Sequence, residues 1–171
     1  MVYLKAINIE DIQKEYEFIT NTPENENGFT NKFCGCSFDE FEKIILPKLI
    51  NNSKGIDLQS GYVASTEYFL WNDDNIVGLF RIRHSLNEFL KNGAGHIGYG
   101  IKEDCRNKGY ATKGLKLAIE KAFEIIEEDE IYMSVSKNNL QSLKVQLNNG
   151  AYIHHEDDEK YYTRIKNQNK K

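Results

Sequence analysis

Two periodicities run through the hydrophobic positions, one typical of strands and the other of helices, and the two kinds of segment are mixed along the chain. Alternating or continuous apolar runs predict strands over residues 2–7, 68–71, 76–82, 96–101, 131–135, 151–154 and 160–165. Spacings of three and four predict helices from Asn8 to about Thr20 and over residues 38–49, 87–91, 111–126 and 140–147. This order favours an α+β fold, in which helices cover one sheet.

Polar segments mark the connections between these elements. Ser37-Phe38-Asp39-Glu40 forms a capping box at a helix start, and Pro47 predicts a kink or a split within that helix. Residues 72–75 form a polar turn between two strands. Residues 21–32 are polar, and we expect a loop of the length that often carries function.

The segment from His96 to Lys116 carries most of the recognisable chemistry. A strand with Gly98 and Gly100 leads into Arg106-Asn107-Lys108-Gly109-Tyr110-Ala111, where a long helix begins. Residues 102–116 hold five basic and two acidic side chains, a net +3, so the rest of the −4 chain carries −7. A positive helix start with glycines suits phosphate binding, although an ordinary turn with solvated lysines fits equally well.

Composition excludes several classes of protein. The 171 residues are 40% hydrophobic, which excludes a disordered chain, and no apolar run is long enough to span a membrane. The acidic balance disfavours nucleic-acid binding and mildly favours a cationic acceptor. Three cysteines do not form a disulfide framework, and Cys34-Gly35-Cys36 lacks a matching ligand pair, so we expect no metal and a reduced, cytoplasmic protein.

The motif from Arg106 to Ala111 resembles the Arg/Gln-x-x-Gly-x-Gly/Ala signature of the GCN5-related N-acetyltransferases. Asn139-Leu140-Gln141-Ser142 is similar to the second cofactor element of that family, and the order of elements matches along nearly the whole chain. Residues 83–88, followed by residues 95–99, look like a bacterial subgroup of predicted acetyltransferases.

The resemblance implies one N-acetyltransferase domain over residues 1–171, built on a mixed, mostly antiparallel sheet of about seven strands. It also implies a splay between the fourth strand (96–101) and the fifth (131–135), where acetyl-CoA binds. A backbone N–H at Tyr99 or Gly100, with Tyr99 preferred, would then polarise the thioester oxygen. The cofactor-binding residues it implies are Ile101, Arg106, Asn107, Lys108, Gly109, Tyr110, Ala111, Asn139 and Ser142.

The groups that move protons are harder to assign. Members of this family often have a tyrosine, the general acid, seven residues after the asparagine that matches Asn139. Here Gln146 occupies that position. Either another tyrosine substitutes for it or the thiolate leaves without an acid. His96 and His84 are candidate bases, and Arg83 and Asn87 are candidate acceptor contacts; each of these four residues has a purely structural alternative.

The sequence therefore predicts an enzyme that moves acetyl from acetyl-CoA to a primary amine of a small molecule or peptide, by direct attack in a ternary complex. The alternative from another class is a non-catalytic acyl-CoA binding or sensing domain. A homodimer is plausible, with residues 160–166 as the expected exposed strand edge.

Overall fold

The computed structural model describes residues 1–168; residues 169–171 of the expected 1–171 domain lie outside the described residues. The strands are β1 (Val2–Ala6), β2 (Asn25–Glu26), β3 (Phe29–Thr30), β4 (Ser65–Asn72), β5 (Asn75–Arg83), β6 (Ile97–Ile101), β7 (Glu130–Ser136), β8 (Tyr152–Glu156) and β9 (Lys160–Lys166). The helices are α1 (Ile12–Asn21), α2 (Phe38–Glu40), the π-helical turn η1 (Phe41–Ile45), α3 (Leu46–Ser53), α4 (Glu88–Lys91), the 3₁₀ turn η2 (Glu103–Cys105), α5 (Tyr110–Ile125) and α6 (Leu140–Asn148).

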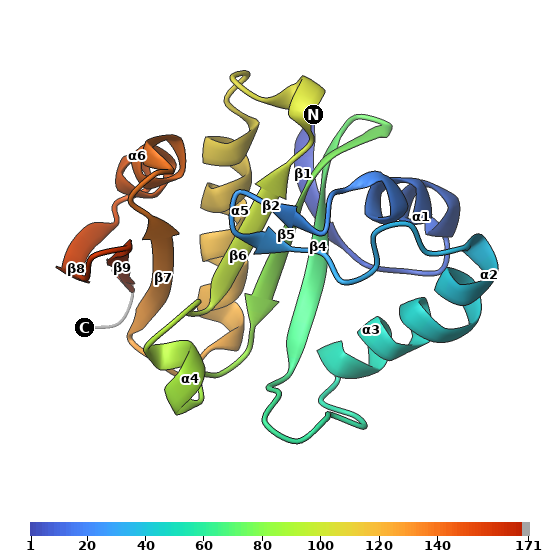
Figure 1. Cartoon of the computed structure of the whole chain (residues 1–171), viewed down its shortest axis with the longest axis horizontal. Coiled ribbons are helices and arrows are strands. Elements are labelled where there is room, and N and C mark those ends of the chain that lie inside the picture. The colour runs from blue at the N-terminus through green and yellow to red at the C-terminus, as the bar shows by residue number, and fades with distance from the viewer. Residues whose placement is uncertain (169–171) are drawn as a thin grey trace.

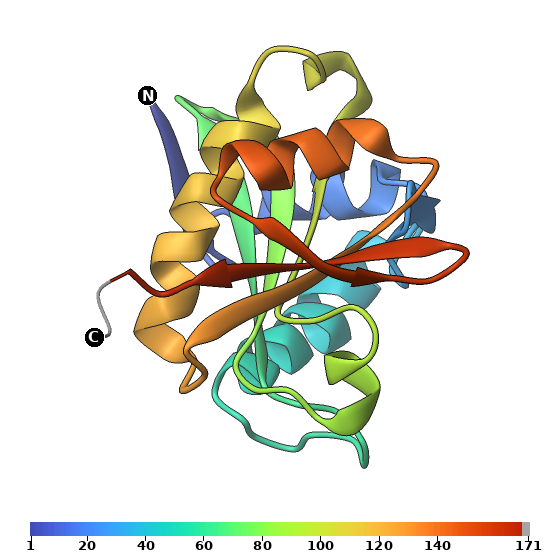
Figure 2. The ribbon, with the colours of Figure 1, turned by 90° about the vertical axis from the view of Figure 1, so that its left-hand side faces the viewer.

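Seven of these strands form the main sheet, in two parts. Four antiparallel strands in the order β1-β4-β5-β6 make one part, and β7-β9-β8 make the other (Figures 1 and 2). The two parts join at the isolated bridge between Gly95 and Met133, beyond which β6 and β7 diverge. The expected mostly antiparallel sheet and its splay between these two strands are confirmed.

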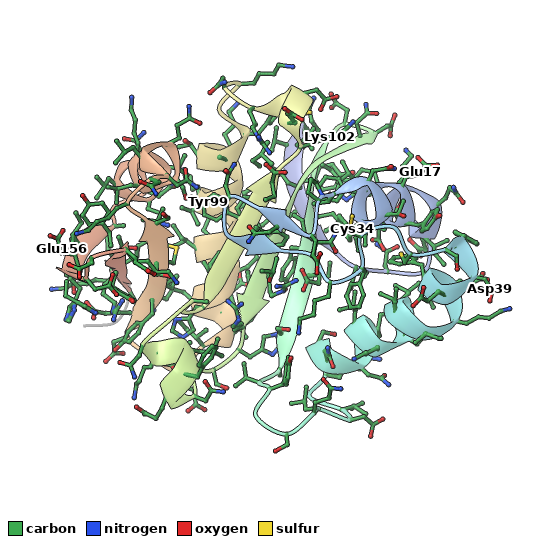
Figure 3. The ribbon with its side chains drawn as sticks, in the orientation of Figure 1. Glu17, Cys34, Asp39, Tyr99, Lys102 and Glu156 are labelled. Atoms are coloured by element: carbon green, nitrogen blue, oxygen red, sulfur yellow. The ribbon has the colours of Figure 1, made fainter. Side chains whose placement is uncertain are left out.

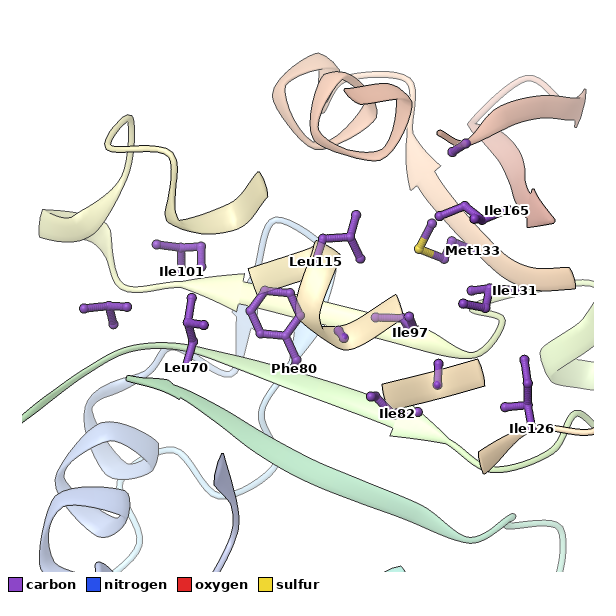
Figure 4. Packing of buried hydrophobic residues seen from close by; sticks show 14 residues of the cluster. Leu70, Phe80, Ile82, Ile97, Ile101, Leu115, Ile126, Ile131, Met133 and Ile165 are labelled. Atoms are coloured by element: carbon purple, nitrogen blue, oxygen red, sulfur yellow. The ribbon is translucent and has the colours of Figure 1, made fainter. Parts of the chain in front are cut away.

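Helices cover both faces of the four-stranded part because its strands alternate two sets of apolar side chains. On β4, Leu70 joins Phe80 and Leu115 in the core beneath α5, which Figure 4 shows at close range. Phe69 and Trp71, on the opposite face, join the core beneath α1 and α3. This part of the sheet therefore separates two hydrophobic cores. Its edge strand β6 borders the splay.

The N-terminal half departs from the predicted elements in two places and agrees with them in a third. Helix α1 begins at Ile12, because Asn8 Oδ1 accepts from the Asp11 N–H in a preceding turn rather than starting the helix. The helix expected over residues 38–49 is divided into the contiguous segments α2, η1 and α3, and Pro47 lies in the first turn of α3, so the split predicted at this proline is confirmed. The loop expected at 21–32 contains the β2–β3 hairpin.

The C-terminal hairpin forms as predicted, but the expected free edge at residues 160–166 is wrong. Strand β9 lies in the middle of its sheet, between β7 and β8. The edge strand is β8, and all five of its residues are exposed. A hairpin pattern in the sequence predicts that its two strands pair with each other. It does not predict which of the two also pairs with a third strand, here β7.

None of the helices in the described part has the length and apolarity that crossing a membrane requires.

Gly114, inside α5, allows this helix to lie directly on the sheet. A Cβ added there would lie 2.4 Å from Phe80 Cζ and 2.9 Å from Leu70 Cδ2, both in fully buried side chains. We expect Gly114→Ala to lower the free energy of unfolding by about 1–3 kcal/mol through overpacking, despite the better helix propensity of alanine. Urea denaturation measures the change. Lys116→Ala, on the exposed side of α5, is the control, and a Gly114→Ala variant as stable as wild type would contradict this packing.

Candidate active site

A cavity of about 1120 Å³ lies in the splay between β6 and β7. Its walls come from β5, β6 and β7, from the start of α5 and from α6. The β2–β3 hairpin crosses in front of β5 and β6 on the side away from α5 (Figure 1). There the Phe29 ring packs over Gly98 and Gly100, about 3.5–4.0 Å from where their Cβ atoms would be. The cavity thus runs the length of β6 beneath a short hairpin.

The edge of β6 that faces this cavity has free backbone groups. Arg83 N–H donates to His96 C=O, and Lys102 N–H donates to Val77 C=O. Because hydrogen-bonded pairs alternate along an antiparallel ladder, these two bonds place the N–H and C=O of Ile97, Tyr99 and Ile101 on the side away from β5. Consistently, the side chain of Arg106 reaches Ile101 C=O from that side, at 3.1 Å.

At the end of β6 lies the turn where phosphate binding is expected from the sequence, which we call the phosphate cradle. Asn107 and Gly109 adopt left-handed backbone conformations, with φ of 60° and 79°, and α5 begins immediately afterwards. A helix start offers unpaired N–H groups and a positive dipole end. The motif residues that line the cavity are Arg106, Asn107, Gly109, Tyr110 and Ala111. Lys108 is not among them, because its Nζ donates to Asp104 C=O, at 2.8 Å.

The positive charge of the cavity has a different origin from the one expected. Of the five basic residues between 102 and 116, only Arg106 lines the cavity, and it is paired with Glu26. The remaining basic residues in the lining come from three other elements: Arg81 and Arg83 from β5, Lys144 from α6 and Lys160 from β9. Glu26 is the only carboxylate in the lining as described, so the cavity suits an anionic ligand.

Helix α6 and its cap bring Asn139 and Ser142, which are expected from the sequence to bind the cofactor, to the cavity. Asn139 caps this helix, because its Oδ1 accepts from the Ser142 N–H, at 3.1 Å. Asn139 Nδ2 also lies 3.5 Å from Asn27 C=O at the tip of the β2–β3 hairpin. Both Asn139 and Ser142 line the cavity, opposite the open edge of β6.

Tyr99 joins β6 to α6 across the cavity, and Figure 3 shows it between these two elements. Its hydroxyl lies 2.7 Å from Ser142 Oγ, and its ring stacks on Phe80. Burial raises the pKa of the Tyr99 phenol, and the side chains of Ser142 and Gln146 partly oppose this shift. The phenol is therefore protonated at neutral pH. Gln146 also lines the cavity, with its Oε1 accepting from Thr163 Oγ1.

His96 is fully buried and lies outside the cavity lining. The ring Nδ1 of His96 accepts a hydrogen bond from the backbone N–H of Tyr132, at 2.9 Å. The backbone N–H of His96 donates to the C=O of Tyr132. The ring Nε2 of His96 lies 3.4 Å from a carboxylate oxygen of Glu128. This arrangement fastens β6 to β7 where the splay begins, and it gives the imidazole no contact with the cavity.

The other three polar candidates, His84, Arg83 and Asn87, also have local partners. His84 Nε2 lies 2.8 Å from Thr66 Oγ1, and Asn87 caps α4 through its Oδ1 while its Nδ2 donates to Gly61 C=O. Neither residue lines the cavity. Arg83 does line it, and its Nη1 donates to Gly95 C=O, at 3.1 Å. Of the acceptor contacts expected from the sequence, only Arg83 reaches the cavity.

We expect His96→Asn to flatten the dependence of stability on pH without altering the pH profile of activity. Burial lowers the pKa of His96, so the unfolded state binds more protons below its ordinary pKa of about 6.5. Wild-type stability is therefore expected to fall as the pH drops below that value. Asparagine retains an acceptor for the Tyr132 N–H but does not titrate. Urea midpoints between pH 5 and 8 test this expectation, and a loss of a kinetic pKa in the variant would assign His96 to proton transfer after all.

Several cavity residues were not identified from the sequence. Glu26 comes from the β2–β3 hairpin, whose two-residue turn is Asn27-Gly28. An Asn-Gly pair is the strongest short-range signal of a hairpin, and it was present in the sequence. Arg81, Lys144 and Lys160 carry no local signal, because only the folded sheet brings them together. Within residues 1–168 there is no group of three potential metal ligands.

Comparison with known families agrees with this geometry. A family model described as an acetyltransferase (GNAT) domain matches residues 2–151. The chain belongs to the GNAT acetyltransferases. A GNAT domain uses acetyl-CoA as its acetyl donor, so the protein is an acetyl-CoA-dependent N-acetyltransferase by family. A search of curated proteins finds no match.

Solved GNAT structures share the fold at low sequence identity. Spermidine N-acetyltransferase from Vibrio cholerae, in complex with CoA and spermine, is 18% identical with a TM-score of 0.64, covering 96% of this chain and 95% of that one. The Campylobacter jejuni N-acetyltransferase PseH, in complex with acetyl coenzyme A, is 19% identical with a TM-score of 0.61 and coverages of 98% and 100%. An aminoglycoside acetyltransferase bound to coenzyme A is 16% identical with a TM-score of 0.66 and coverages of 98% and 96%.

Proposed function

We propose that this GNAT protein transfers the acetyl group of acetyl-CoA to a primary amine by direct attack, with both substrates bound in the cavity between β6 and β7. The observation that carries the proposal is the free edge of β6. On this edge the N–H of Tyr99 points toward the cavity, and the hydroxyl of the same residue lies 2.7 Å from Ser142 Oγ, which also belongs to a lining residue. One residue thus offers a donor for the thioester oxygen and an acid for the leaving sulphur.

The cavity residues fit the coenzyme in three places. The pyrophosphate would lie against the N–H groups of Gly109, Tyr110 and Ala111 at the start of α5. The pantetheine arm would form strand-like hydrogen bonds with the free N–H and C=O of Tyr99 and with the N–H of Ile101. On the opposite wall Asn139 and Ser142 would contact the same arm, and the coenzyme supplies the activated acetyl thioester.

The reaction then needs charge stabilisation and one proton transfer. The N–H of Tyr99 donates to the thioester oxygen as negative charge develops there. As the amine nitrogen bonds to the carbonyl carbon and the carbon–sulphur bond breaks, the Tyr99 phenol gives its proton to the sulphur. The proton released by the amine returns to the phenolate, directly or through water. The products are the acetylated amine and coenzyme A, and Tyr99 takes the place left by Gln146.

A non-catalytic acyl-CoA sensor is the competing function, because Gln146 has no acidic proton to give. Tyr99 weakens this alternative, since its phenol reaches α6 within one turn of Gln146. The two functions differ in turnover rather than in binding. A sensor is stabilised by acetyl-CoA but releases no thiol with any amine.

The test is a thiol-release assay with acetyl-CoA and a panel of primary amines, run beside thermal denaturation with and without acetyl-CoA. We expect an acetyl-CoA-dependent rise in the melting temperature and release of coenzyme A with at least one amine. A rise without thiol release supports the sensor. The absence of both results would contradict acetyl-CoA binding itself.

Two wider features belong to the same proposal. The cysteines Cys34, Cys36 and Cys105 are free, which fits a reducing compartment such as the cytoplasm. Self-association would use the exposed edge strand β8 rather than β9. One solved structure of the Vibrio cholerae enzyme is described as dodecameric.

A further inference from the structure

Arg83 is the last residue of β5, and it carries the one guanidinium in the described cavity lining that has no carboxylate partner within 4.0 Å. Its Nη1 donates to Gly95 C=O, at 3.1 Å. A guanidinium has five N–H donors in a planar fork, so most of its donors remain available. Its side chain faces the cavity at the α4 end, near Phe89 and Ala94.

The other two arginines in the lining are neutralised. Arg81 Nε lies 2.5 Å from Glu67 Oε1, and Arg106 pairs with Glu26. Glu67 also acts electrostatically on Arg83, but it is almost fully buried and already bonded to Arg81. Arg81 and Arg83 therefore bring two positive charges to the cavity wall against the single negative charge of Glu67, which lies outside the lining.

An uncompensated charge in a partly enclosed site is costly, and its cost is recovered when a ligand supplies the opposite charge. Burial lowers the pKa of Arg83 to about 10, so this side chain stays positively charged at neutral pH. A carboxylate matches the guanidinium fork, because both groups are planar and form two parallel hydrogen bonds.

The phosphates of the coenzyme are poorly placed to be that anion. Arg83 lies beside His96, before the first residue of β6, whereas the phosphate cradle begins after its last residue. Five strand residues span about 17 Å. The two sites thus lie at opposite ends of the cavity, with Tyr99 between them, and an anion at Arg83 belongs to the acceptor.

We infer that the acceptor is an amine that carries a carboxylate, and that Arg83 binds this carboxylate while the amine points toward Tyr99. The inference rests on the proposed acetyl transfer and narrows its acceptor to amino acids and related zwitterions. It also refines the mild preference for a cationic acceptor, since the positive charge at the α4 end of the cavity disfavours a polyamine.

The test compares ω-amino acids from glycine to 6-aminohexanoate with their carboxamides in the thiol-release assay. We expect at least one acid to be acetylated with a kcat/KM tenfold or more above that of its amide. Arg83→Gln should remove this preference mainly through KM, and Arg83→Lys should retain part of it. Lys121→Gln, on α5 outside the cavity, is the control, and an unchanged acetyl-CoA thermal shift shows that each variant is folded.

The possible outcomes separate the inference from the proposed function. Equal rates for acids and amides, or a preference that survives Arg83→Gln, overturn the carboxylate site while acetyl transfer stands. A preference for O-phosphoethanolamine or for a polyamine over every amino acid also overturns it. Failure of every amine to release thiol contradicts acetyl transfer itself.

Discussion

Replacing Tyr99 with phenylalanine is expected to lower kcat about a hundredfold or more while acetyl-CoA still binds. The substitution removes only the hydroxyl, which lies 2.7 Å from Ser142 Oγ, and leaves the ring stacked on Phe80. Loss of a positioned general acid costs roughly 10²–10⁴ in rate. Steady-state thiol release with the best amine measures kcat, and the acetyl-CoA thermal shift measures binding.

Tyr152→Phe is the matched control for this variant. Its hydroxyl also has a hydrogen-bond partner, Glu130, but it lies on the exposed strand β8 and outside the cavity. We expect its kcat to equal that of wild type. A wild-type kcat in Tyr99→Phe would show that the thiolate leaves without an acid from this residue.

Gly109→Val is expected to abolish the acetyl-CoA thermal shift. Gly109 has a φ of 79°, a conformation that disfavours β-branched residues, and its N–H lies where the coenzyme pyrophosphate would bind. No other atom lies within 4 Å of a Cβ added there, so the new side chain would occupy ligand space rather than the core. Wild type at a hundred times Kd gains about 2.7 kcal/mol from binding, and the variant would lose this gain.

Gly150→Val separates backbone strain from lost binding. Gly150 has a φ of 86° and an equally open Cβ position, but it follows α6 and lies outside the cavity lining. Both variants should lose similar stability without ligand, and only Gly109→Val should lose the shift. A full acetyl-CoA shift in Gly109→Val would contradict the placement of the pyrophosphate.

The fold was predictable because its signals are local. The alternation in β4 and β5 and the amphipathic pattern of α5 fix the elements, and the motif around Gly109 fixes the family. The order of β8 and β9 in the sheet was not predictable in the same way. It depends on which of these two strands pairs with β7, and β7 is distant in the sequence. The β2–β3 hairpin was not predicted, although the pair Asn27-Gly28 is typical of a two-residue hairpin turn.

The site was less predictable, because it depends on side chains that meet only in the folded chain. Histidine is a common general base, yet the ring of His96 is fully buried outside the cavity lining. There its Nδ1 accepts a hydrogen bond from the backbone N–H of Tyr132. Arg81 forms an ion pair with Glu67 on the adjacent strand β4, whereas Arg83 has no carboxylate partner within 4.0 Å in the described residues. No spacing in the sequence distinguishes them.

The most direct test of acetyl transfer is to quantify both products of one reaction that contains the protein, acetyl-CoA and an accepted amine. Thiol titration gives the coenzyme A released, and mass spectrometry gives the acetylated amine. The proposed mechanism predicts equal amounts of the two, with neither formed in Tyr99→Phe at a comparable rate. Thiol release without acetylated amine, or acetyl-CoA binding without either product, would contradict it.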